Sequence, residues 1–265
     1  MSTIVSTKFK GYNSPEYQII KELFASIPMM DVYVANIIEE YIYSIVREYY
    51  PSKDRINKGS LKYEYRTKYG EKDGEYKEWS KDGQLWIQKY YKEDKLEGEY
   101  KSWWNNGQLK MKKYYKDGKR KEEYKEWHDN GQLRIQTYFK EDKLEGEYKK
   151  WYYNKQLNIQ TNYIEGKLHG EYKKWWEYGE IGIQTHCVEG KLHGEYKEWY
   201  DNGQLCNQST YVEGKLHREY KKWYYNKQLS IQTNYIEGKL NGEYKEWHED
   251  GQLKIQTTYV EGVMI

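Results

Sequence analysis

Three histidines, His169, His193 and His217, recur every 24 residues and are the side chains best placed for metal chemistry. Zinc binds imidazole nitrogen at about 2 Å. Repeats of two strands would separate neighbouring histidines by about 10 Å, because strands in a sheet lie about 4.8 Å apart. That separation excludes a shared ion. We therefore expect no metal site and interpret the histidines as a polar column.

No other arrangement of residues in the sequence is typical of catalysis. A Gly-rich phosphate loop, a nucleophile elbow and a His-Glu-x-x-His motif are all missing from the sequence. Glu and Lys are abundant, but they recur with the 24-residue spacing, as solvated cross-strand pairs would. Because no site can be assembled from residues with named roles, we expect no enzymatic activity and no cofactor.

A column of tryptophans marks the same period and is the candidate interaction surface. Each closes a Glu-Tyr-Lys-x-Trp motif, and the eight are Trp79, Trp103, Trp127, Trp151, Trp175, Trp199, Trp223 and Trp247. One interpretation makes them structural, packed by Lys, Gln and Tyr of adjacent strands; the other makes them an exposed comb for a ligand. A regular strand would turn the tryptophan away from the leucines and tyrosines, whereas a bulge before it would reverse this.

Each repeat predicts a strand, a turn, a second strand and a second turn. In residues 191–211, for example, two strand-like runs flank Asp201, Asn202 and Gly203, and Asn-Gly favours a tight hairpin turn. The second strand of each repeat also alternates. In the repeat that contains Trp151, for example, Leu157, Ile159, Thr161 and Tyr163 share one parity, which predicts one buried face. The fold class is mainly β: an elongated antiparallel meander of about eight repeated β-hairpins, with a small α-helical N-terminal segment.

The composition favours a folded protein without a polyanionic partner. The mean hydropathy is −1.22, yet 18% of the residues are aromatic and can bury large apolar rings. The net charge is only +2, so we expect no nucleic-acid binding. We see no transmembrane segment or signal peptide and expect an intracellular protein, cytoplasmic or peripheral to a membrane. Cys187 and Cys206 differ in repeat phase and are interpreted as isolated substitutions.

The repeat resembles a known family. Gly-Lys-Leu-His-Gly-Glu-Tyr at 166–172 and 190–196, followed by Trp, Asn-Gly and an apolar strand, resembles the MORN repeat in its variant form with Asn-Gly-Gln-Leu. The resemblance covers about residues 74–262 and implies an all-β array that acts in scaffolding, self-association or attachment near membranes. Some copies depart from it, because Lys155 and Lys227 replace the turn glycine and Arg218 replaces the glycine of Gly-Glu-Tyr.

The N-terminal residues follow a different pattern. Apolar residues in 15–27 and 31–50 recur at helical spacing, which predicts two amphipathic helices. We interpret residues 1–60 as a helical cap or docking segment and residues 61–265 as the repeat array. A cap would cover the first edge strand. Alternatively, Ile27-Pro28 with the apolar residues that follow is weakly similar to the start of an F-box, an adaptor module.

The sequence thus predicts a non-enzymatic scaffold that binds a protein partner or itself. One alternative is a binder of acidic phospholipid surfaces through its lysine column, although glutamates of the same parity would largely cancel that charge. The other alternative is an F-box-like adaptor whose array captures a target.

Overall fold

The computed structural model describes residues 4–5, 43–51 and 59–265, and every regular element in these ranges is a β-strand. The chain divides into two compact units, which we describe separately. The N-terminal unit extends to Lys121 and includes Asp129–Gly131, and the C-terminal unit consists of Glu122–His128 and Gln132–Ile265.

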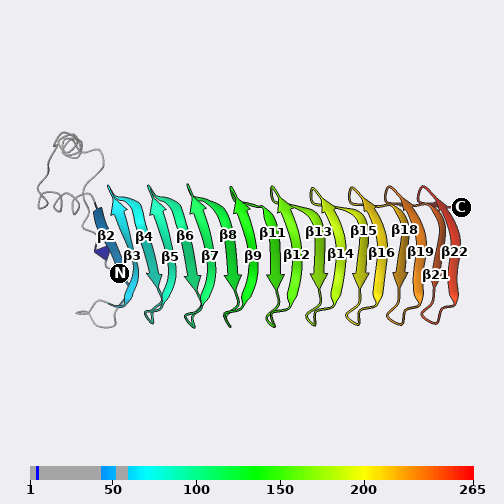
Figure 1. Cartoon of the computed structure of the whole chain (residues 1–265), viewed down its shortest axis with the longest axis horizontal. Coiled ribbons are helices and arrows are strands. Elements are labelled where there is room, and N and C mark those ends of the chain that lie inside the picture. Colours follow the sequence, from blue (N-terminus) through cyan, green and yellow to red (C-terminus); the bar gives the residue numbers. More distant parts are fainter. Residues whose placement is uncertain (1–3, 6–42, 52–58) are drawn as a thin grey trace, which may run out of the picture. The chain divides into compact units, whose positions relative to one another are not determined.

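In the N-terminal unit, antiparallel strands pair in chain order (Figure 1). They are β1 (Ile4–Val5), β2 (Tyr43–Tyr49), β3 (Leu61–Lys68), β4 (Glu71–Trp79), β5 (Leu85–Lys92), β6 (Lys95–Trp103) and β7 (Leu109–Lys116). The boundary between the units falls within β8 (Lys119–Trp127).

The C-terminal unit continues as the same kind of meander. After β8 its strands are β9 (Leu133–Lys140), β10 (Lys143–Leu144), β11 (Gly146–Trp151), β12 (Leu157–Ile164), β13 (Lys167–Trp175), β14 (Ile181–Val188), β15 (Lys191–Trp199), β16 (Leu205–Val212), β17 (Lys215–Leu216), β18 (Arg218–Trp223), β19 (Leu229–Ile236), β20 (Lys239–Leu240), β21 (Gly242–Trp247), β22 (Leu253–Val260) and β23 (Val263–Met264). The expected antiparallel meander is confirmed. In three repeats the first strand is interrupted, at Glu145, His217 and Asn241.

Each repeat forms the predicted hairpin, and we name each hairpin by its tryptophan. In the Trp199 hairpin, Gly203 adopts a φ of 79°, which only glycine reaches without strain. Its N–H donates to the carbonyl of Tyr200 at 3.0 Å, and Asn202 Oδ1 accepts from the Gln204 N–H at 3.0 Å. The Asn-Gly pair therefore closes the turn with backbone and side-chain hydrogen bonds.

A β-bulge near the turn decides which face each residue occupies. In the Trp175 hairpin Lys174 pairs with Ile183, but Trp175 pairs with Ile181, so Gly182 is an extra residue in the second strand. Because the first strand stays regular, Trp175 faces away from Tyr172, and Ile181 faces the same way as Trp175. The bulge therefore displaces the first apolar residue of the second strand, not the tryptophan. The expectation that Leu157 shares the face of Ile159 and Thr161 is wrong for this reason, since Trp151 pairs with Leu157 across the same bulge.

Within the described residues no further layer of structure packs on the sheet, so few side chains are fully buried. Cys187, 4% exposed, is the one buried hydrophobic side chain in that part of the chain. The buried row consists instead of small hydroxyl side chains, among them Thr137, Thr161, Ser209 and Thr233, each 1% exposed. Beside them lie edge-to-face aromatic pairs such as Tyr148 with Tyr163, at 5.8 Å between centroids. We call this side of the sheet the tyrosine face.

The helical prediction for residues 31–50 is wrong where the structure describes it. Residues 43–49 form strand β2, which pairs with β3 through the same register shift as the repeats, with Tyr49 in the position of the tryptophan. Residues at i and i+4 share a strand face as well as a helix face, so spacings such as Ile45 to Tyr49 do not separate the two structures. The predicted helix over residues 15–27, and the F-box-like residues, lie outside the described residues.

Candidate functional site

The most regular chemical feature is a polar cluster that recurs on the face opposite the tyrosines, which we call the glutamate–lysine face. In the Trp151 hairpin, Glu147 accepts an ion-paired hydrogen bond from Lys149 at 2.8 Å and another from the Gln160 amide at 3.0 Å. Equivalent clusters join Glu75 to Lys77 and Gln88, Glu123 to Lys125 and Gln136, Glu171 to Lys173 and Gln184, Glu195 to Lys197 and Gln208, Glu219 to Lys221 and Gln232, and Glu243 to Lys245 and Gln256.

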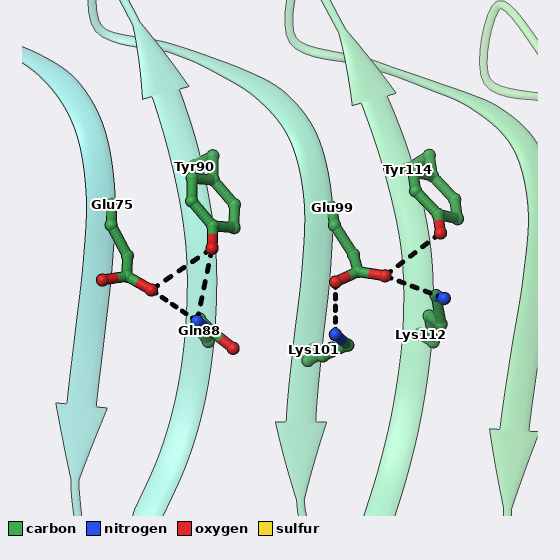
Figure 2. A network of polar contacts seen from close by, with 7 residues as sticks. All are labelled: Glu75, Gln88, Tyr90, Glu99, Lys101, Lys112 and Tyr114. Carbon is green, nitrogen blue, oxygen red and sulfur yellow. Dashed lines mark hydrogen bonds and ion pairs between the residues drawn. The ribbon is translucent and has the colours of Figure 1, made fainter.

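The Trp103 hairpin departs from this pattern, because Lys112 stands where the others have glutamine. Figure 2 shows the consequence: Glu99 binds Lys101, Lys112 and the Tyr114 hydroxyl, whereas Glu75 in the neighbouring hairpin binds Gln88 and the Tyr90 hydroxyl. Burial alone would raise the pKa of Glu99, but hydrogen bonds from the two lysines and the tyrosine outweigh it and lower the pKa to about 2. Glu99 thus stays ionised, and its carboxylate oxygens are already hydrogen-bonded within the protein.

The lysine column is neutralised within the protein. In each cluster the lysine lies two residues after its glutamate on the same strand face. Lys173, for example, lies 2.7 Å from Glu171, and Lys197 lies 2.8 Å from Glu195. Hydrogen bonds from Lys173 lower the pKa of Glu171, which keeps the pair charged at neutral pH. The lysines therefore present paired charge at this face, as the glutamate positions in the sequence predict.

The eight tryptophans of the candidate interaction surface are all half-buried. The bulge geometry places them on the glutamate–lysine face, one to a hairpin, so they form neither a buried core nor a fully exposed comb. Their role in binding stays a prediction.

Sequence reasoning missed a tie between hairpins that involves the tryptophan backbone. The residue after one tryptophan reaches the carbonyl oxygen of the next tryptophan along the chain. Tyr152 donates its hydroxyl hydrogen to Trp175 O at 2.9 Å, and Tyr224 donates to Trp247 O at 2.9 Å. Tyr50, Trp176 and Tyr200 donate in the same way to Trp79, Trp199 and Trp223. The signal was available as a column of Tyr, Trp and His directly after the tryptophans.

The tyrosine face offers little for catalysis. Burial raises the pKa values of Tyr148, Tyr172 and Tyr220, so these phenols remain protonated and neutral at physiological pH. Among the described residues no group of three or more His, Cys, Asp or Glu side chains could hold a metal ion. Cys187 and Cys206 are both free thiols, as their separate repeat phases predict.

Comparison with known families explains the recurrence. Six segments, residues 72–93, 96–117, 123–141, 144–165, 192–213 and 240–261, match the model described as the MORN repeat variant. The chain carries MORN repeats. No curated protein matches it. The MORN model leaves out the Trp175 and Trp223 hairpins, yet both have the register shift of the matched ones. Within the described ranges, no helix combines the length and the apolar character needed to cross a membrane.

Proposed function

We propose that this MORN repeat protein is a scaffold that binds a protein partner through the faces of its sheet and performs no chemistry of its own. The observation that carries the proposal is the recurrence of one polar cluster from hairpin to hairpin, with both faces of the sheet open in the described residues. Recurrence supports an extended contact, because a catalytic site would need different residues brought together at one place.

The dimensions of the hairpins suit such a contact. A strand of eight residues, such as β12, is about 26 Å long, and two strands occupy about 9.6 Å, so one hairpin face covers about 250 Å². A stable interface buries about 800 Å² on each partner. About three adjacent hairpins would therefore suffice.

The lipid alternative has less support because the lysines it would use are already paired with glutamate. Headgroup binding would have to break contacts such as Lys197 with Glu195 at 2.8 Å. The F-box-like alternative depends on residues outside the described ranges. The assignment of residues 1–60 as a cap or docking segment beside an array at 61–265 stays a proposal, and so does an intracellular location, which the free thiols favour.

Affinity purification of the tagged full-length chain, followed by mass spectrometry and reconstitution of the top hit from purified components, tests the proposal. Sedimentation with vesicles containing 30% phosphatidylserine runs in parallel. We expect a stoichiometric protein complex and little vesicle binding. Salt-sensitive vesicle binding without a reconstituted protein complex would contradict the proposal.

A further inference from the structure

An open groove of about 680 Å³ lies on the tyrosine face of the N-terminal unit, at the Trp103 hairpin. Its lining includes Trp86, Trp104, Met111, Lys110 and Lys113. The volume falls within the range of about 300 to 1,000 Å³ that is usual for ligand sites. The Trp103 hairpin also departs from the repeat sequence at this place.

One small residue distinguishes the lining of this groove from the same place in the other hairpins. Ser102 occupies a position that holds Glu or Lys in the other seven hairpins: Glu78, Glu126, Lys150, Lys174, Glu198, Lys222 and Glu246. Ser102 pairs with Met111 across the hairpin and lies in the groove lining. Serine lacks the long side chain that fills this place elsewhere, so space remains between the tyrosine face and the turn.

The same substitution leaves a cation without its carboxylate. Arg134 and Lys254 occupy the bulge position in their hairpins, and they form ion pairs with Glu126 at 2.8 Å and Glu246 at 2.6 Å. Lys110 occupies that bulge position in the Trp103 hairpin, where the glutamate is replaced by Ser102. Within the described residues Lys110 has no ion pair, and its ammonium lies 4.3 Å from the centroid of the Trp104 ring.

The rest of the lining combines apolar surface with one more cation. Trp86 is 40% exposed and is held by a hydrogen bond from its Nε1 to Asn105 Oδ1 at 3.1 Å. Lys113 stands 4.4 Å from the centroid of the Tyr100 ring, again without an ion pair among the described residues. Asp129 also belongs to the lining, and its backbone carbonyl accepts a hydrogen bond from the Asn106 side-chain amide. The groove therefore offers two cations, indole surface and one acidic residue.

We propose that this groove binds an extended acidic peptide segment of the scaffold's protein partner. A carboxylate of the peptide takes the place beside Lys110 that Glu126 and Glu246 fill in their own hairpins. An apolar side chain of the peptide packs against Trp86 and Met111. A second carboxylate reaches Lys113, three residues along β7 and about 10 Å from Lys110, which matches residues three apart in an extended peptide. Asp129 disfavours a uniformly anionic ligand such as a nucleic-acid strand.

The proposal rests on the proposed protein-binding function, and a displayed random library of 12-residue peptides tests it on the full-length chain. We expect selection to enrich peptides that combine Asp or Glu with an aromatic or large aliphatic residue. Ser102→Glu introduces the residue that Glu78, Glu126, Glu198 and Glu246 provide in their hairpins. It fills the space and pairs Lys110, so it should weaken binding of the enriched peptides at least tenfold in fluorescence anisotropy. Ser102→Ala keeps the space and should change affinity less than twofold. Lys110→Gln should weaken binding about fivefold or more.

Enrichment of no peptide class, or of peptides that bind Ser102→Glu as well as the natural chain, would overturn the groove assignment. So would preferential binding of a ten-nucleotide oligothymidine or of phosphatidylserine vesicles that is lost in Ser102→Glu. The partner complex separates the two proposals. If the reconstituted complex binds Ser102→Glu unchanged, the scaffold function stands and the groove proposal fails. If no complex forms with either chain, the scaffold function itself fails.

Discussion

Removing the hydroxyl of Tyr152 tests whether neighbouring hairpins are held by the tie to the tryptophan carbonyl. Tyr152→Phe keeps the ring and deletes only the 2.9 Å hydrogen bond to Trp175 O. Such a bond contributes about 0.5 to 1.5 kcal/mol, and the half-buried carbonyl left behind adds to the loss. We therefore expect the Trp151 and Trp175 hairpins to lose about 1 to 1.5 kcal/mol of opening free energy.

A second tie provides an internal check on this magnitude. Tyr224→Phe removes the equivalent 2.9 Å bond to Trp247 O. The two sites are three hairpins apart, about 29 Å along a meander of this spacing, so their effects should add to within about 0.5 kcal/mol. The control is Tyr178→Phe, because Tyr178 is 83% exposed and its loss should be close to neutral.

Hydrogen exchange followed by mass spectrometry is the appropriate assay, since repeat proteins open locally and a single global free energy of unfolding is not defined for them. Peptides covering β11 to β14 should exchange faster in Tyr152→Phe and those covering β21 and β22 faster in Tyr224→Phe. If Tyr152→Phe behaves like Tyr178→Phe, or if the faster exchange is spread evenly over the chain, the tie is not a stabilising contact.

Three further substitutions or titrations probe the backbone, the threonine row and the glutamate clusters. Arg218 and Lys227 adopt φ values of 70° and 74° at positions where six of the eight hairpins have glycine. Arg218→Gly and Lys227→Gly should therefore each stabilise their hairpins by about 1 kcal/mol in the same exchange assay, and a loss of stability would show that the residues are unstrained. Thr161 Oγ1 donates to Glu171 O at 3.1 Å, whereas the equally buried Thr137 Oγ1 has no partner in the described residues, so Thr161→Val should cost about 1 kcal/mol and Thr137→Val nothing; equal effects would refute this difference. The pKa of Glu99 is lowered from 4.5 to about 2, so the stability that its ionised carboxylate contributes is present above pH 4.5 and is lost as the pH falls toward 2. Glu99→Gln should therefore flatten the acid-induced loss of thermal stability in the N-terminal unit. An unchanged pH profile would contradict the stabilising role of this carboxylate.

The hairpins and their turns were predictable because a 24-residue period, Asn-Gly pairs and alternating parity all act locally. The bulge was not predictable from the sequence. The alternation of apolar and polar residues along one strand does not reveal the extra residue at Gly182 or its equivalents, which appears only in the pairing between the two strands of the hairpin. The strand at residues 43–49 was missed because apolar residues four apart fit a helix and a strand equally well. The groove was missed for the same reason as the bulge. Ser102 and Lys110 are eight residues apart, and only the pairing of β6 with β7 shows that they replace a Glu–cation pair.

The most direct measurement of the central claim is a hydrogen-exchange comparison of the free chain with its reconstituted partner complex. Because an interface of about 800 Å² needs about three hairpin faces, the scaffold function predicts protection of strand amides over at least three adjacent hairpins of one unit. If a peptide segment of the partner occupies the groove, the protected amides should include those of β5 to β7, and their protection should weaken in Ser102→Glu. Protection confined to the turns, or protection produced by phosphatidylserine vesicles and not by any protein, would contradict the claim that the sheet is a protein-binding surface.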